Sequence, residues 1–374
     1  MTNITNGFQK VPEFTNYFDV ASELVGGKII FATDDWFAAA ENMLKAGDAV
    51  FKPDLFTEYG KWMDGWESRR KRIPGNDWCI IELGCPSDVK GFEVDTHHFT
   101  GNYPPRCSIR GVELPNKLPA RSGDRIGTAA SEKEMKAIEQ LHSENWELLV
   151  PMSELGAGYK DTHRNFFEVK NSKRLTHIRL DIYPDGGVAR LRVHGEVKRD
   201  WSLVNEKEKV DLAAMINGGI CVDYSDAHYG HARNVIAPGR ANQMDEGWET
   251  LRRKDRPPVL TKEALETYGG EWAIYKLGHP GQITNIEIDT NHFKGNFPYA
   301  FTLEGTHIDE NNNSIDRKTN WQKIIPKYKL SAHKQHFLEK EVQDIGAVNH
   351  VRLTIYPDGG VSRMILKGYI TRNK

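Results

Sequence analysis

The chain has 374 residues, of which 50 are basic and 52 acidic, and its formal net charge at neutral pH is −2. This balance, with both signs interspersed, argues against a nucleic-acid partner and against a polybasic membrane-binding surface. No apolar run approaches the ~20 residues needed to span a bilayer, and the first residues lack the charged and apolar regions of a secretory signal.

The first half of the chain is predicted to contain short strands and few helices. An N-terminal arm over residues 1–20 overlaps a short helix over 16–25, and a glycine turn and a buried strand over 26–32 follow. A second short helix over 36–44 is capped by Asp34 or Asp35. A capping box at Ser131 and Glu134 predicts one further helix. The remaining strands are expected at residues 77–84, 89–96, 146–150, 165–169, 176–182 and 188–197.

Three phrases return in the second half in the same order, so the sequence predicts an internal duplication. Asp-Gly-Trp-Glu-Ser-Arg-Arg at 64–70 returns within 245–253, where Glu246 counts as an extra residue. Asp-Thr-His-His-Phe-Thr-Gly-Asn at 95–102 has its counterpart at 289–296, and Tyr-Pro-Asp-Gly-Gly-Val at 183–188 has its counterpart at 356–361. We therefore place one repeat at 21–200 and a second at 201–374.

The strands do not alternate with helices as a parallel sheet requires. The strand over 89–96 alternates apolar Phe92 and Val94 with polar Glu93 and Asp95, the pattern of a half-buried strand. The Tyr-Pro-Asp-Gly-Gly segments supply turn residues and are predicted to be structural. These patterns predict a mainly β fold of two tandem homologous antiparallel β-sandwiches of jelly-roll type, with a few short helices.

Segment 64–70 contains the first group of candidate functional residues. Arg69 and Arg70 present forked donors suited to a carboxylate, and Glu67 can act as a general acid or base. The second copy offers Glu249, Arg252 and Arg253. The alternative is a buried ion network, in which the acids neutralise the arginines and lock a loop to the sandwich.

Histidines at the end of the 89–96 strand form the second group. His98 matches His292, whereas Asn291 replaces His97. The retained imidazole is either a hydrogen-bonding group in the core or the acid or base of a site. Asp95 either orients that imidazole or holds the turn, and Asp35 is either a helix cap or a further functional carboxylate.

The sequence indicates no metal or cofactor site. His228 and His231 lie near acids, but the first half has no matching pair and no dependable ligand spacing. The Gly-Gly pairs lack the spacing of a phosphate-binding loop, and no Ser or Cys lies in a nucleophile elbow. The four cysteines form no C-x-x-C pair, which favours a reducing compartment.

The duplicated motifs resemble those of the allantoicase (allantoate amidinohydrolase) family. The matching segments are 33–43, 64–70, 95–102 and 183–190 in the first half, and 225–239, 244–253, 289–296 and 356–363 in the second. The resemblance covers nearly the whole chain. The second copy departs from the family pattern over residues 257–270, which replace a short link, so this departure would alter only a site in the second half.

The resemblance implies two sandwiches like those of galactose-binding modules, and the hydrolysis of allantoate to ureidoglycolate and urea in purine degradation. Arg69 and Arg70 would hold the substrate carboxylate, and Glu67 and His98 would transfer protons with Asp95 and Asp35 beside them. The other residues expected to contact the substrate are Trp66, Asn102, Asp64, Glu249, Arg252, Arg253, His292 and Asn296.

Two other functions are consistent with the same fold. One is a non-catalytic β-sandwich that binds carbohydrate or another small ligand, and the other is an inactive allantoicase relative. The duplicated glutamate beside paired arginines favours the enzyme. The family further implies a small-molecule substrate and a homo-oligomer, and the C-terminus lacks a peroxisomal Ser-Lys-Leu signal, so we expect a cytoplasmic location.

Overall fold

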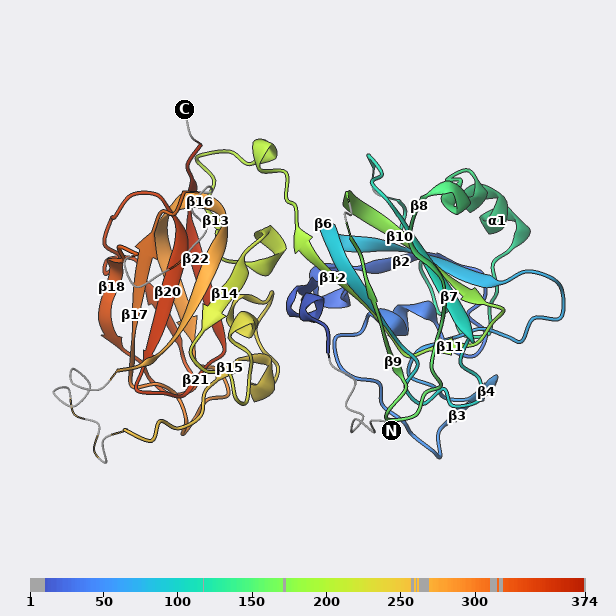
Figure 1. Cartoon of the computed structure of the whole chain (residues 1–374), viewed down its shortest axis with the longest axis horizontal. Coiled ribbons are helices and arrows are strands. Elements are labelled where there is room, and N and C mark those ends of the chain that lie inside the picture. The colour runs from blue at the N-terminus through green and yellow to red at the C-terminus, as the bar shows by residue number, and fades with distance from the viewer. Residues whose placement is uncertain are drawn as a thin grey trace, which may run out of the picture. The chain divides into compact units, whose positions relative to one another are not determined.

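The computed structural model describes residues 11–116, 118–170, 173–256, 269–309 and 319–372, together with 259, 261 and 315. The chain divides between Lys198 and Arg199 into two units (Figure 1). The first ten residues of the predicted N-terminal arm, most of the second-half segment 257–270 and the last two residues lie outside the described residues. None of the described helices is long and apolar enough to cross a membrane.

One long strand organises the sheet of each unit (Figure 1). β6 (Asp77–Asp95) and β16 (Glu271–Asp289) each have 19 residues. The prediction of separate strands at 77–84 and 89–96 was wrong, because Gly84 continues the strand instead of ending it. A Cβ atom at Gly84 would lie 2.3 Å from the carbonyl oxygen of Val25, so this glycine permits a close approach of two backbone segments.

The two units have the same antiparallel topology. The first sheet runs β1-β12-β6-β10-β7-β8, and β2 and β9 also pair with β6. The second runs β13-β22-β16-β20-β17-β18, and β14 and β19 also pair with β16. The first-unit bounds are β1 (Phe18–Asp19), β2 (Lys28–Ala32), β7 (Arg106–Val112), β8 (Glu147–Glu154), β9 (Arg164–Glu168), β10 (Arg174–Tyr183) and β12 (Arg190–Val197). The second-unit bounds are β13 (Val210–Asp211), β14 (Ile220–Tyr224), β17 (Ala300–Thr306), β18 (Gln322–Lys329), β19 (Gln335–Leu338), β20 (Val348–Tyr356) and β22 (Arg363–Ile370).

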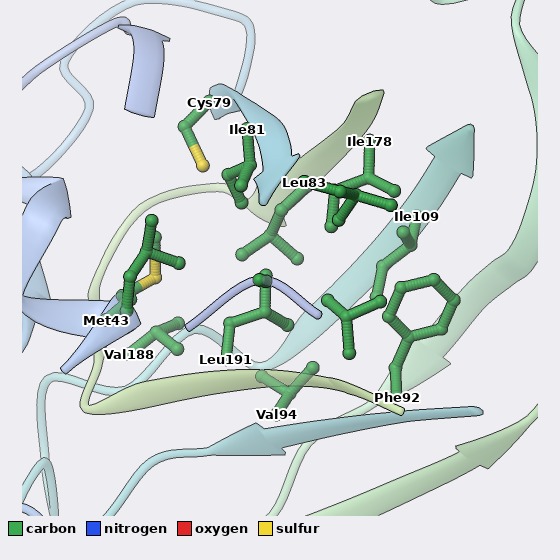
Figure 2. Packing of buried hydrophobic residues seen from close by; sticks show 14 of the residues in the cluster. Met43, Cys79, Ile81, Leu83, Phe92, Val94, Ile109, Ile178, Val188 and Leu191 are labelled. Carbon is green, nitrogen blue, oxygen red and sulfur yellow. The ribbon is translucent and has the colours of Figure 1, made fainter. Parts of the chain in front are cut away.

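The long strand contributes to both layers of its sandwich. Residues 79–82 of β6 pair with β2, whereas residues 91–95 pair with β9. Figure 2 shows that side chains of the two layers point toward one another, among them Leu83, Ile109, Ile178, Phe92, Val94 and Leu191. Each fully buried aliphatic side chain contributes about 1.5–3 kcal/mol relative to exposure. The predicted fold, two tandem antiparallel β-sandwiches with few helices, is confirmed.

The short helices were predicted less well than the strands. The capping box is confirmed, because Ser131 caps α1 (Glu132–Glu139) and exchanges hydrogen bonds with Glu134. The predicted helix over 36–44 is a shorter 3-10 helix, η3 (Ala40–Leu44). The prediction of a helix over 16–25 was wrong, because β1 in the middle of that segment pairs with β12. Sheet pairing here overrides the local helical pattern.

Candidate active site

Glu67 lies on a two-residue strand at the end of the first sandwich. β5 (Trp66–Glu67) pairs with β11 (Gly187–Val188) on one side and bridges to Ala38 on the other. Because alternate side chains of a strand point to opposite faces, Trp66 lies fully buried in the core while Glu67 lies on the other face. The Trp66 indole N–H donates to the backbone oxygen of Asp34 at 2.8 Å. Trp66 therefore anchors the segment that begins at Asp34.

The Glu67 carboxyl group has one hydrogen-bond partner and no cationic one among the described residues. Asn102 Nδ2 donates to Glu67 Oε1 at 2.7 Å. Burial raises the pKa of Glu67 from 4.5 to about 7, and the Asn102 hydrogen bond opposes this only in part. The group is therefore near half-protonation at neutral pH, so it can both donate and accept a proton.

Arg69 is hydrogen-bonded to Asp34 through its backbone N–H and its Nε, which leaves its two terminal Nη nitrogens available. Asp34 accepts from the Arg69 backbone N–H at 3.1 Å and from Arg69 Nε at 2.8 Å. The guanidinium group lies over the Trp36 ring, 4.3 Å from its centroid. Neither Nη nitrogen has a partner among the described residues, and the side chain is 45% exposed. Arg69 is thus oriented in advance to bind an anion through paired donors. Arg70 is exposed.

Asp35 belongs to an ion network that the sequence did not predict. Its side chain is fully buried and accepts from Arg121 Nη1 at 2.6 Å and Nη2 at 3.0 Å. Arg121 also donates to both oxygens of Glu41 at 2.7 Å. Arg121 lies in the connection between β7 and β8, 86 residues from Asp35, and outside the repeated phrases.

Asp64 has a structural environment. It accepts hydrogen bonds from Arg190, Lys45 and the backbone of Val50. Burial opposes ionisation of Asp64, but these donors outweigh it and lower the pKa of the carboxyl group. Arg190 also donates to the backbone oxygens of Gly47 and Asp64. For Asp64 the geometry therefore favours the alternative interpretation, a buried ion network that locks a loop to the sandwich.

The histidines form a column of stacked rings. The His97 ring lies 3.7 Å from that of His98 and 4.2 Å from that of His163, measured between centroids. Asp95 contacts His163 Nδ1 at 2.7 Å, not His98, whose Nε2 lies 3.1 Å from the backbone oxygen of Ala49. Burial and the two neighbouring imidazoles lower the pKa of His97. His163 was missed by the sequence analysis, because only the pairing of β9 with β6 brings it to Asp95.

The second unit repeats the glutamate–amide pair. β15 (Trp248–Glu249) pairs with β21 (Gly360–Val361), and Asn296 Nδ2 donates to Glu249 Oε1 at 2.5 Å. The Trp248 indole donates to the backbone oxygen of Asp226, as Trp66 does to that of Asp34. His292 Nε2 lies 3.0 Å from a backbone oxygen, as His98 Nε2 lies 3.1 Å from one.

The second unit lacks the arginine that its sequence suggested. The backbone N–H of Leu251 donates to Asp226 Oδ2 at 2.7 Å, so Leu251 occupies the place of Arg69. The backbone N–H of Arg253 donates to Asp358 just as that of Lys71 donates to Asp185. Arg252 and Arg253 therefore correspond to Arg70 and Lys71. Glu246 is not an extra residue, because its backbone oxygen accepts from Arg363 as that of Asp64 accepts from Arg190.

A surface cavity of about 560 Å³ in the first unit is lined in part by Tyr103, Met152 and Tyr183, and Glu67 is not among its lining residues. Among the described residues, no group of three or more His, Cys, Asp or Glu side chains is placed to hold a metal ion. The Glu67 carboxyl group can transfer a proton, and Arg69, two residues further along the chain, presents two guanidinium nitrogens without a partner among the described residues.

Comparisons with known proteins agree with the motifs. The model of the allantoicase repeat matches residues 18–198 and 210–371. A probable allantoicase of Pseudomonas fluorescens (strain SBW25) is 39% identical over 96% of this chain and 98% of its own length. One of Photobacterium profundum is 38% identical over 96% of this chain and 99% of its own length. The crystal structure of allantoicase from Saccharomyces cerevisiae is 32% identical, covers 94% of this chain and 93% of its own, and superposes with a TM-score of 0.67.

Proposed function

This chain belongs to the allantoicase family, and from that premise we propose that it hydrolyses allantoate to ureidoglycolate and urea at a site in its first repeat. In this reaction the bond between the central carbon and one ureido nitrogen breaks. Water supplies a hydroxyl group to the carbon and a proton to the departing nitrogen. The site must therefore bind the substrate carboxylate, protonate a nitrogen and deprotonate water.

We assign the proton transfers to Glu67. Protonated Glu67 donates to the leaving ureido nitrogen, and the resulting carboxylate then accepts a proton from the attacking water. The observation that supports this assignment is a half-buried carboxyl group with no cationic partner among the described residues, whose pKa is raised to about 7. Asn102 fixes its Oε1 and leaves Oε2 for the substrate. General acid–base groups of this kind typically contribute about 10²–10⁴ in rate.

We assign the substrate carboxylate to Arg69, because both Nη nitrogens are available and Asp34 and Trp36 orient the side chain. Arg70, which follows it and is exposed, is a second candidate for the same anion. Trp66, Asp35 and Asp64 act through the residues they hold, since all three are buried in contacts within the protein.

Asp95, His98 and the second repeat have supporting parts in this proposal. Asp95 also accepts from the backbone N–H of His97 at 2.7 Å, and this bond and the ring column hold the loop that carries Asn102. The second repeat keeps Glu249, Asn296 and His292 but has Leu251 in place of the carboxylate-binding arginine. We therefore propose that it does not turn over allantoate.

Urea release from allantoate by the purified protein tests this function. Stoichiometric urea and ureidoglycolate are expected, with no urea from allantoin, and a parallel reaction with chelator decides whether a metal is required. Folded protein that releases no urea would favour the ligand-binding module or the inactive relative. The place in purine degradation, the cytoplasmic location and the homo-oligomer stay predictions, the last to be tested by light scattering.

A further inference from the structure

Residues 118–130 clamp the segment that orients Arg69. Thr33, Asp35 and Trp36 exchange backbone hydrogen bonds with this connection: Ala130 N–H donates to the oxygen of Thr33, Asp35 N–H to that of Thr128, and Gly127 N–H to that of Trp36. The connection therefore lies on one side of this segment. On the other side, the carboxylate of Asp34 and the ring of Trp36 contact Arg69.

The Asp35–Arg121 ion pair is the main side-chain link in this clamp, and Arg125 Nε of the same connection lies farther from Asp35, at 3.8 Å. Arg121 is 9% exposed, and each of its three guanidinium nitrogens donates to a carboxylate of Asp35 or Glu41. A guanidinium group engaged in this way has little capacity left for a substrate. Arg121 is therefore placed to act on Arg69 through Asp35, and not on the substrate itself.

In the second repeat, other residues occupy the positions of both Asp35 and Arg69. Asn234 donates to the backbone oxygen of Gly247 as Asn42 does to that of Gly65. Counting from these two asparagines, Ala227 occupies the position equivalent to Asp35, and Arg233 the position equivalent to Glu41. Leu251 stands where Arg69 does. The corresponding connection, between β17 and β18, spans only residues 307–321, whereas the first repeat uses 113–146.

We propose that Arg121 is a positioning residue that sets the specificity of the first repeat for a substrate carboxylate, by holding Asp35 and through it the Asp34–Trp36 segment that orients Arg69. This inference rests on the proposed function. It goes beyond it by assigning carboxylate selectivity to a buried ion pair that does not touch the substrate.

The test uses the double variant Asp35→Ala/Arg121→Gln, which removes both members of the buried pair and reproduces Ala227 of the second repeat. Arg125, whose Nε lies 3.8 Å from Asp35 Oδ2, keeps Glu134 as an ion partner in this variant. Its KM for allantoate is expected to rise about 10- to 100-fold, the effect of losing a charge-assisted hydrogen bond, with kcat changed less than about threefold. For the neutral analogue in which a carboxamide replaces the carboxylate, kcat/KM should equal that of the wild type. Adding Arg69→Leu should cause little further loss, because both changes remove one interaction.

The control is Arg179→Gln/Asp181→Asn, which removes another buried bidentate pair of the same unit. It is expected to lower the melting temperature while preserving the preference for carboxylate over carboxamide. Equal losses on both substrates in the Asp35/Arg121 variant, or full additivity with Arg69→Leu, would overturn the inference and leave the proposed function intact. Wild-type protein without allantoate turnover would overturn both.

Discussion

Replacing Glu67 by glutamine separates the proposed catalytic role of this carboxyl group from its contribution to stability. Glutamine keeps the oxygen that accepts from Asn102 but cannot transfer a proton or ionise. The variant is expected to lose activity by about 10²–10⁴-fold. The matched control is Glu249→Gln, which alters the corresponding pair in the second repeat and should keep near-wild-type turnover.

The stability effect follows from the raised pKa of Glu67. Burial moves this pKa from 4.5 to about 7, and at about 1.4 kcal/mol per pKa unit the difference corresponds to about 3 kcal/mol. The folded protein holds the proton more tightly than the unfolded chain, so wild-type stability falls as pH rises from 4.5 to 7 and the loss is complete above 7. The free energy of unfolding of Glu67→Gln minus that of the wild type should therefore be larger at pH 8 than at about pH 4, by up to about 3 kcal/mol.

Guanidinium chloride unfolding of the two proteins at pH 4 and pH 8 measures this difference, and urea release measures activity. Because Glu67 must begin protonated to act as an acid, kcat/KM of the wild type should also fall as pH rises through about 7. The reasoning fails if Glu67→Gln retains near-wild-type turnover. It fails equally if the stability difference between variant and wild type is the same at both pH values.

Three further predictions use the repeats as internal references. Arg69→Leu, which installs the residue found at Leu251, should raise KM for allantoate about 10- to 100-fold in initial-rate assays; an unchanged KM would exclude Arg69 as the carboxylate ligand. Asn102→Ala should lower kcat by about tenfold or more, because Glu67 loses the hydrogen bond that fixes it, whereas Asn296→Ala should not; equal effects would contradict a site confined to the first repeat. Burial and the neighbouring imidazoles lower the pKa of His97, so the unfolded chain binds a proton there more readily than the folded protein, and stability falls as pH drops below the ordinary pKa of 6.5. His97→Asn should therefore show a smaller drop in melting temperature between pH 7.5 and 5.5, and an unchanged drop would refute this.

Local patterns were sufficient to predict the fold class and most of the strands of the first unit, although β7 (Arg106–Val112) was not among those predicted. Alternation along residues 89–96 and the duplicated phrases predicted the strands and the two repeats, because both signals lie within short segments. Gly84 was misinterpreted as the end of a strand, because a glycine required for close backbone approach has the same sequence signature as one in a turn. The helix expected over 16–25 failed for a related reason, since the pairing of Phe18 with Gly195 is invisible locally.

The groups of the candidate site could be singled out from the sequence where they lie close together in the chain, but not where the fold joins distant segments. Glu67 and Arg69 stand in one short phrase, but His163 reaches Asp95 only through the pairing of β9 with β6. Arg121 reaches Asp35 only through a folded connection. The position of Leu251 could have been found by counting three residues from the tryptophan of each repeated phrase, whereas matching arginine to arginine shifted the comparison by one residue.

Several contacts that the two repeats share are made to backbone oxygens, whereas two contacts that distinguish the first repeat join side chains. Trp66 and Trp248, like Arg190 and Arg363, donate to backbone oxygens, so these residues fix the path of the chain in both units. The contacts confined to the first repeat, those of Asp35 with Arg121 and of Arg69 with Asp34, join side chains and orient charge.

The Glu249–Asn296 pair is a side-chain contact that persists in the second repeat without Arg69, and the Arg363–Glu246 ion pair, which corresponds to Arg190–Asp64, is another. Its persistence argues that the glutamate–amide pair helps to close the end of either sandwich whether or not a reaction takes place there. On this argument the glutamate–amide pair alone does not make a site for an anionic substrate, and the feature that distinguishes the first repeat is the guanidinium group of Arg69, which Asp34 and Trp36 orient.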